Sequence, residues 1–323
     1  MYGFIFRYAA KYIKIFSSFP YLCAPITQVS MQWSHNFIYH VIAILIVCIW
    51  GVTFISTKVL ITCGLSPQEI FFLRFLIAYV GIWFISPHRL WTNHWKDELW
   101  LLAGGVTGGS FYFLTENTAL GITLATNVSF IVCTAPLLTT LLSLFIYRQE
   151  RATFSLIGGS LVALVGVALV VYNGSVVLKI SPWGDFLTLL AAFSWAFYSL
   201  IMKKMTMRYP ITFITRKIFF YGVLTILPAF AVHPWQFPLE GLFHTGVLLN
   251  LFFLSVVASL ICYAVWNVVL VRLGTLRASN YIYLNPVSTT IGSALLLGEP
   301  ITLVSVIGAV LILSGVYLAG IQR

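Results

Sequence analysis

Long apolar runs, separated by short polar segments, recur along the chain from Ile38 to Gly320. Each run holds roughly 18 to 25 residues, enough for an α-helix to cross a hydrocarbon core of about 30 Å. Runs such as VIAILIVCIWG do not alternate between apolar and polar positions, which is typical of helices and not of membrane-spanning strands. The pattern predicts an all-α polytopic membrane protein with ten transmembrane helices, over residues 38–60, 69–86, 98–120, 124–147, 154–172, 184–203, 211–232, 245–270, 276–297 and 301–320.

Composition supports this class. Of the 323 residues, 60% are hydrophobic and 8% are charged, and the mean hydropathy is +0.98, outside the usual range of soluble domains. The net charge of +10 is spread between the apolar runs and does not gather on one polar face, so no nucleic-acid partner is expected. The five cysteines form no CxxC pair and no cluster with histidine. Neither a disulfide framework nor a metal or other cofactor is therefore indicated.

The basic residues predict an orientation. Thirteen Lys and Arg residues fall in segments on the side of the N-terminus, whereas only Lys58 and Lys179 fall on the other side. The positive-inside rule then places both termini in the cytoplasm, and we expect a multi-pass protein of the cell membrane, the inner membrane of a bacterium. Residues 1–37 are expected to form a cytoplasmic or interfacial segment, since they show no signal-peptide cleavage pattern. Because Met31 is a second possible start, the presence of residues 1–30 in the native protein stays open.

The sequence contains an internal duplication. WGVTFISTK, from Trp50, matches WAFYSLIMK, from Trp195, and both place a lysine eight residues after the tryptophan. Residues 150–167 also align with residues 299–316 at a constant offset of 149. We therefore expect two repeats of five helices, 38–172 and 184–320, and the odd number inverts the second repeat in the membrane. Inverted repeats are typical of transporters with a cavity between their halves, although channels and scaffolds can also be duplicated.

Several segments resemble one known family. They are WGVTFISTK, FFLRFLIA, APLLTTLLSLF, NPVSTTIGSALLLGEPIT and VIGAVLILSGVYL. Taken together and in this order, they resemble the EamA-like branch of the drug/metabolite transporter superfamily over about residues 38–320. The resemblance implies ten helices around a central cavity and the movement of small organic solutes, often the export of amino acids, other metabolites or drugs. It does not identify the solute.

An ionisable residue within the third predicted helix is the first candidate for function. Glu116 lies next to Asn117 in FYFLTENTALG. A charge at the bilayer centre costs about 2.5 to 3.5 kcal/mol, and protonating a glutamate of reference pKa about 4.3 at pH 7 costs about 3.7 kcal/mol. These costs are similar, so a modest change of surroundings can switch the protonation state. We predict that Glu116, supported by Asn117, is the main polar element of a solute or proton pathway; the alternatives are an interfacial acid or a structural partner of Arg74.

Other candidates have both a structural and a functional interpretation. The midspan tryptophans either pack or form the cavity wall, and tyrosine and asparagine side chains are second-rank pathway candidates. Two prolines are predicted to kink the fourth and ninth helices and to free backbone carbonyls. Arg74 and Arg216 are expected to extend toward the nearby interface. The candidates are Trp50, Trp195, Trp266, Asn127, Asn267, Tyr281, Tyr283 and Asn285, with the kinks at Pro136 and Pro286.

These features favour a secondary transporter that works by alternating access, with the lipid bilayer, a small organic solute and protons as its partners. An integral membrane enzyme is less favoured because the predicted spans have no HExxH motif, carboxylate pair or Ser/His/Asp set. A passive channel would be expected to show rings of charge or a carbonyl filter, and neither pattern occurs. The sequence does not distinguish a monomer from a homodimer.

Overall fold

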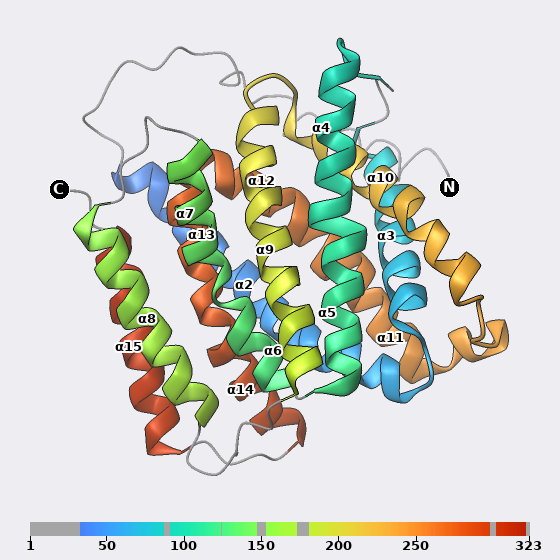
Figure 1. The fold of residues 1–323 in the computed structure, drawn as a ribbon. Helices are drawn as coiled ribbons and strands as arrows, with labels where there is room; N and C mark the ends of the chain where they lie inside the picture. Colours follow the sequence, from blue (N-terminus) through green and yellow to red (C-terminus); the bar gives the residue numbers. More distant parts are fainter. Residues whose placement is uncertain are drawn as a thin grey trace, which may run out of the picture. The chain divides into compact units, whose positions relative to one another are not determined.

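The computed structural model describes residues 33–86, 91–123, 125–146, 153–172, 181–297 and 302–320. The chain forms two units, residues 1–36 and 37–323, and the helices described here lie in the second unit except for the first turn of α2. Within the described ranges every regular element is helical (Figure 1). The predicted all-α class is therefore confirmed.

Six of the ten predicted stretches are single helices. They are α2 (Trp33–Thr62), α3 (Pro67–Trp83), α8 (Phe154–Tyr172), α9 (Pro182–Met205), α10 (Ile211–Val232) and α15 (Leu303–Gly320). Their bounds agree with the predicted ones to within a few residues, because Pro, Gly and polar clusters mark most of the ends.

The remaining stretches are interrupted helices. The third is α4 (Trp95–Gly105), η1 (Val106–Ser110) and α5 (Phe111–Ile122), and the fourth is α6 (Ala125–Val132) and α7 (Ala135–Ile146). The eighth is α11 (Thr245–Phe252), η3 (Phe253–Ile261) and α12 (Cys262–Leu273), and the ninth is α13 (Thr275–Asn280), η4 (Tyr281–Leu284) and α14 (Asn285–Leu297). A short 3-10 helix, η2 (Leu239–Phe243), precedes α11. The five-residue gap expected between the eighth and ninth stretches is wrong: Gly274 alone joins them, at a φ of +83° that glycine adopts without strain.

Length and apolar composition fit a membrane environment. In the described part of the chain, five helical stretches are long and apolar enough to cross a bilayer: Phe37–Thr62, Val128–Ile146, Pro182–Met205, Ile211–Val232 and Thr245–Leu273. Phe154–Leu169 and Val306–Ala319 are shorter apolar helices. Large apolar side chains face outward, whereas many polar and aromatic side chains are buried. This distribution is expected of a helix bundle surrounded by lipid.

The third and eighth stretches each contain a π-helical segment. π-helical segments interrupt the regular α-helical ladder, which leaves carbonyls open to side-chain donors. In η1, Gly109 is the non-helical residue, and the carbonyl of Gly108 accepts a hydrogen bond from the Tyr263 hydroxyl. In η3, the carbonyl of Ala258 accepts a hydrogen bond of 3.0 Å from Nε1 of Trp50. Each π-helical segment is thus tied to a distant helix by an aromatic side chain.

Two further interruptions occur next to prolines. Helix α6 ends at Val132, and α7 begins one residue before Pro136. Pro286 is the second residue of α14, directly after the 3-10 turn η4. The two interruptions meet, because the Cys133 thiol donates a hydrogen bond of 3.4 Å to the carbonyl of Ile282. The regular helix is therefore interrupted just before each proline, where the missing N–H of the proline costs no helical hydrogen bond.

Helices α8 and α15 pack side by side (Figure 1). A Cβ atom added at Gly159 would lie 2.5 Å from the Gly315 carbonyl oxygen, and one added at Gly166 would lie 2.6 Å from the Gly308 carbonyl oxygen. As the residue number rises along α8, it falls along α15, so the two helices run antiparallel. Glycine at the crossing lets the backbones approach closely.

Candidate functional site

A cavity lies among helices from both halves of the sequence. Its lining comes from Trp50, Thr53 and Phe54 of α2, Arg74 of α3, Tyr112, Phe113 and Glu116 of α5, Val132 of α6, Trp195 of α9, Tyr263 of α12, Ile282 of η4 and Asn285 of α14. The open space is small, about 30 Å³, which suits one or two water molecules. Among the described residues, no cluster of His, Cys, Asp and Glu could hold a metal ion.

The structure places Glu116 in this lining. Its side chain is buried, and Oε1 accepts a hydrogen bond of 2.7 Å from the Tyr112 hydroxyl, one helical turn earlier. The expected support from Asn117 is wrong, because consecutive helical residues point about 100° apart. Nδ2 of Asn117 instead donates to the carbonyl of Pro67 at 3.2 Å, which ties α5 to the start of α3. The spacing of four residues between Tyr112 and Glu116 is the sequence signal that identifies the real partner.

The expectation that Arg74 reaches toward the interface is also wrong. Arg74 is buried, with 3% of its surface exposed, and its side chain lines the cavity. Nε donates to the Ser259 hydroxyl, and Cζ lies 4.3 Å from the ring centroid of Phe113. Across the described part of the chain, no carboxylate oxygen lies within 4.0 Å of this guanidinium, so Arg74 and Glu116 share the cavity without forming an ion pair. The Arg74 side chain points into the bundle because the face of α3 that carries it packs against η3 and α5.

The three candidate tryptophans come together. Trp50 and Trp195 line the cavity, with ring centroids 5.4 Å apart in an edge-to-face arrangement. Trp266 is fully buried and contacts Trp50, with centroids 5.0 Å apart, but it lies outside the lining. Tyr263, which sequence analysis missed, is close to Trp50 and Trp195, with centroid distances of 6.2 and 5.8 Å. The wall beside Glu116 is therefore largely aromatic.

The polar candidates separate into two groups. Asn285 lines the cavity, and its Oδ1 has no hydrogen-bond partner within the described ranges. Asn267 does not line it: Oδ1 accepts from the Tyr198 hydroxyl at 2.7 Å and Nδ2 donates to Thr215 at 2.8 Å, which gives this residue a structural role. The hydroxyl of Tyr281 pairs with His40, and Tyr283 is buried away from the lining. The side chain of Asn127 falls outside the described part of the structure.

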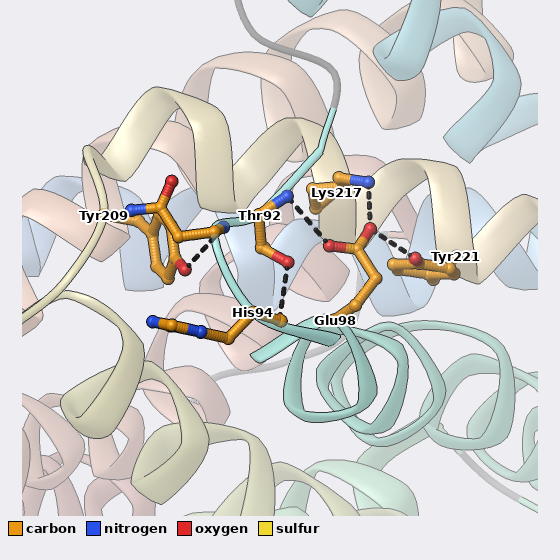
Figure 2. Close-up of polar contacts among 7 residues, drawn as sticks. Thr92, His94, Glu98, Tyr209, Lys217 and Tyr221 are labelled. Atoms are coloured by element: carbon orange, nitrogen blue, oxygen red, sulfur yellow. Dashed lines mark hydrogen bonds and ion pairs between the residues drawn. The ribbon is translucent and has the colours of Figure 1, made fainter. Parts of the chain in front are cut away.

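A second polar cluster joins α4 to α10 (Figure 2). Glu98 forms an ion pair with Lys217, accepts a hydrogen bond of 2.5 Å from the Tyr221 hydroxyl, and accepts one of 3.2 Å from the backbone N–H of Thr92. The cluster does not contribute to the cavity lining. The opposite charges and the hydroxyl donor of this cluster satisfy one another, so we interpret it as a structural contact that holds α4 against α10.

Asp97, the residue before Glu98, adds further contacts between the beginning of α4 and the segment that precedes α10. Asp97 forms an ion pair of 2.7 Å with Arg208 and accepts a hydrogen bond of 2.8 Å from the Tyr209 hydroxyl. The same hydroxyl oxygen accepts a hydrogen bond of 3.1 Å from the backbone N–H of Asn93. Two consecutive acids at the beginning of α4 thus hold the chain on either side of Pro210, and they also suit the positive end of the α4 dipole.

Comparison with known proteins agrees with this architecture. A model of the EamA-like transporter family matches residues 37–172 and 182–321. A probable amino-acid metabolite efflux pump of Salmonella typhimurium is 29% identical over 290 residues, covering 86% of this chain and 93% of that protein. The corresponding Escherichia coli pump is 28% identical over 288 residues, with 86% and 93% covered.

Two further matches cover most of the chain. An uncharacterized transporter of Archaeoglobus fulgidus is 26% identical over 283 residues, covering 86% of this chain and 96% of its own. A solved crystal structure shares the fold with a TM-score of 0.68 at 19% identity, over 88% of this chain and 96% of that chain. Since the family model matches both halves, the chain belongs to the EamA-like transporter family and is a multi-pass membrane transporter, not an enzyme.

Proposed function

We propose that this protein is a secondary transporter that moves a small organic solute across the cytoplasmic membrane through the cavity around Glu116. The observation that carries the proposal is a buried carboxyl in the lining of a cavity formed by helices of both halves. Two relatives are named probable amino-acid metabolite efflux pumps, which supports an amino acid or related metabolite as the solute and export as the direction.

The proposed topology has ten crossings, two inverted repeats at 38–172 and 184–320, and both termini in the cytoplasm. Support comes from contacts that are preserved when the two repeats are exchanged. The offset of 149 matches Gly159 with Gly308 and Gly166 with Gly315, so the contact of Gly159 with Gly315 corresponds to that of Gly166 with Gly308. A two-fold axis perpendicular to antiparallel helices produces this exchange.

Contacts nearer the cavity support the same axis. Cys133 lies three residues before Pro136 and Ile282 lies four before Pro286, so the hydrogen bond between them joins nearly equivalent positions, as expected close to the axis. Trp50 and Trp195, matched by the internal duplication, also touch each other.

Alternating access is supported by the size of the cavity. A space of about 30 Å³ holds water but not a metabolite, so passage requires the surrounding helices to move apart. The π-helical segments and the interruptions before Pro136 and Pro286 are places where helices can bend without the loss of a regular α-helical ladder.

Proton coupling is proposed to act through Glu116. The titratable groups around it are the Tyr112 hydroxyl, which bonds it, and Arg74 and Tyr263, which share the lining. The Glu116 carboxylate can bind either a proton or a cationic group of the solute. Binding of the proton weakens binding of the solute, and binding of the solute weakens binding of the proton. Such competition exchanges an outgoing solute for incoming protons.

The test is transport by the purified full chain in proteoliposomes, using labelled amino acids, polyamines and aromatic amines with and without an imposed pH gradient. We expect Glu116→Gln to insert normally but to lose the response to the pH gradient. Glu240→Gln is the matched control, because Glu240 is exposed in η2 and lies outside the cavity. Wild-type flux and pH dependence in Glu116→Gln would assign the acid a structural role. Flux that neither saturates nor shows counterflow would favour a passive channel.

A further inference from the structure

We infer that Arg74 is the carboxylate-binding residue of the cavity and that, together with Glu116, it selects a zwitterionic solute with an apolar side chain. This inference rests on the proposed transport function and names the chemistry that the cavity recognises. It assigns Arg74 a direct contact with the solute.

The guanidinium of Arg74 is held in a fixed orientation at the cavity. Nε donates to the Ser259 hydroxyl, and the face of the group lies against the Phe113 ring at 4.3 Å. An arginine side chain has five N–H donors, and only this one hydrogen bond of Arg74 is formed within the described ranges. The terminal N–H groups therefore retain donors, in the planar arrangement that binds a carboxylate through two parallel bonds.

Electrostatics require a counter-charge for this group. Burying a guanidinium is costly unless it is paired, and the nearest acid in the lining, Glu116, is not within ion-pair distance. A solute carboxylate placed between the helices would supply the direct partner that Glu116, which shares the lining but lies beyond ion-pair distance, does not. The site then needs no net charge from the solute, because Arg74 and Glu116 are of opposite sign.

Other residues of the lining suit an ammonium group. Glu116 offers a carboxylate, and Asn285 offers Oδ1, which has no partner in the described part of the chain. The rings of Trp195 and Tyr263 lie at the same cavity and can stabilise a cation by their π-faces. The remaining wall is apolar, with Phe54, Val132 and Ile282, which suits an aliphatic or aromatic side chain.

The second half offers a contrast. Arg216 occupies a similar place after a proline, but its guanidinium lies 4.7 Å from the Trp83 ring centroid and donates to the Ser86 carbonyl. It does not line the cavity. The position of an arginine shortly after a proline therefore does not by itself place its side chain in the cavity. Arg216 serves as a control, because it has the same guanidinium group outside the cavity.

The experiment measures counterflow of labelled L-phenylalanine in proteoliposomes containing the full chain. The reference competitor is unlabelled L-phenylalanine. L-phenylalaninamide and phenethylamine lack the carboxylate, and 3-phenylpropionate lacks the ammonium group. For the wild type, we expect each of the three analogues to compete at least about tenfold more weakly than L-phenylalanine. Arg74→Gln should weaken competition by L-phenylalanine about tenfold to a hundredfold and leave phenethylamine nearly unchanged.

Variants separate recognition from folding. Arg74→Lys keeps the charge but not the planar fork, so an intermediate loss is expected, and Arg216→Gln should keep the wild-type order of competitors. If Arg74→Gln is not monodisperse after purification, Ser259→Ala, which removes the anchor of Nε, should give a smaller loss that is again selective for carboxylates.

The outcomes distinguish this inference from the proposed function. A wild-type protein that transports amines but not L-phenylalanine or L-leucine, or an Arg74→Gln variant that retains the preference for carboxylates, overturns the inference and leaves a transporter. An equal loss for all competitors in Arg74→Gln assigns Arg74 a structural role and also overturns it. A wild-type protein that transports none of the screened solutes counts against the proposed function itself.

Discussion

At the scale of single residues, burial decides which ion pair contributes to stability. The side chains of Lys217 and Glu98 are 5% and 17% exposed, whereas that of Arg208, paired with Asp97, is 54% exposed. Removing the buried Lys217 leaves the Glu98 carboxylate without its cation. Arg208 lies largely in water and contributes little, and Asp97, whose side chain is 3% exposed, keeps its hydrogen bond from Tyr209 when Arg208 is removed. We expect Lys217→Gln to destabilise the protein by about 2 to 4 kcal/mol and Arg208→Gln by less than about 1 kcal/mol.

Apparent melting temperatures of the two variants, purified in the same detergent, measure this difference. Asp97 keeps the Tyr209 hydroxyl in Arg208→Gln, which is a further reason for the small effect. Equal decreases in melting temperature would show that burial at the α4 end of the bundle does not control the strength of these pairs.

At the scale of elements, close helix packing depends on which of two adjacent glycines faces the partner helix. A Cβ atom at Gly159 would lie 2.4 Å from the backbone nitrogen of Ala319 and 2.5 Å from the Gly315 carbonyl oxygen, whereas one at Gly158 meets nothing within 4 Å. Backbone atoms cannot move aside as a flexible side chain can. We therefore expect Gly159→Ala to separate α8 from α15 and to destabilise the protein by about 1 to 3 kcal/mol.

Gly158→Ala is the matched control, since it adds the same methyl group one position away on the same helix. Alanine also favours a helix over glycine, so this variant should be neutral or slightly more stable. Thermal unfolding and recovery after detergent extraction measure both variants, and a Gly159→Ala protein as stable as Gly158→Ala contradicts the proposed crossing.

At the scale of the whole molecule, the proposed orientation places the end of α2 outside the cell and the beginning of α4 inside. Cys63 is exposed just after α2, and Lys96 is exposed in the first turn of α4. In a variant with the other cysteines replaced by alanine, we expect a membrane-impermeant maleimide to label Cys63 in intact cells. With Cys63→Ala and Lys96→Cys, labelling should require permeabilised cells. The reverse pattern would invert the orientation.

Much of the fold follows from the sequence alone. Apolar length predicts where the helices begin and end, since spanning a bilayer requires a minimum run, and the 149-residue offset reveals the duplication. Of the candidate site residues, Glu116, Trp50, Trp195 and Asn285 line one cavity. They stood out because an acid or a repeated tryptophan inside an apolar run is uncommon.

The tertiary structure alone decided which face of each helix points inward. In a soluble helix, an apolar stripe reveals the buried face, but a membrane helix is apolar nearly all round, so its rotation about its own axis is not encoded in the pattern. Sequence analysis therefore sent Arg74 outward and paired Glu116 with Asn117, whereas packing brings Arg74, Tyr112 and Tyr263 to the cavity. The π-helical segments were missed for a related reason: their freed carbonyls are satisfied by Trp50 and Tyr263 from helices far away in the sequence.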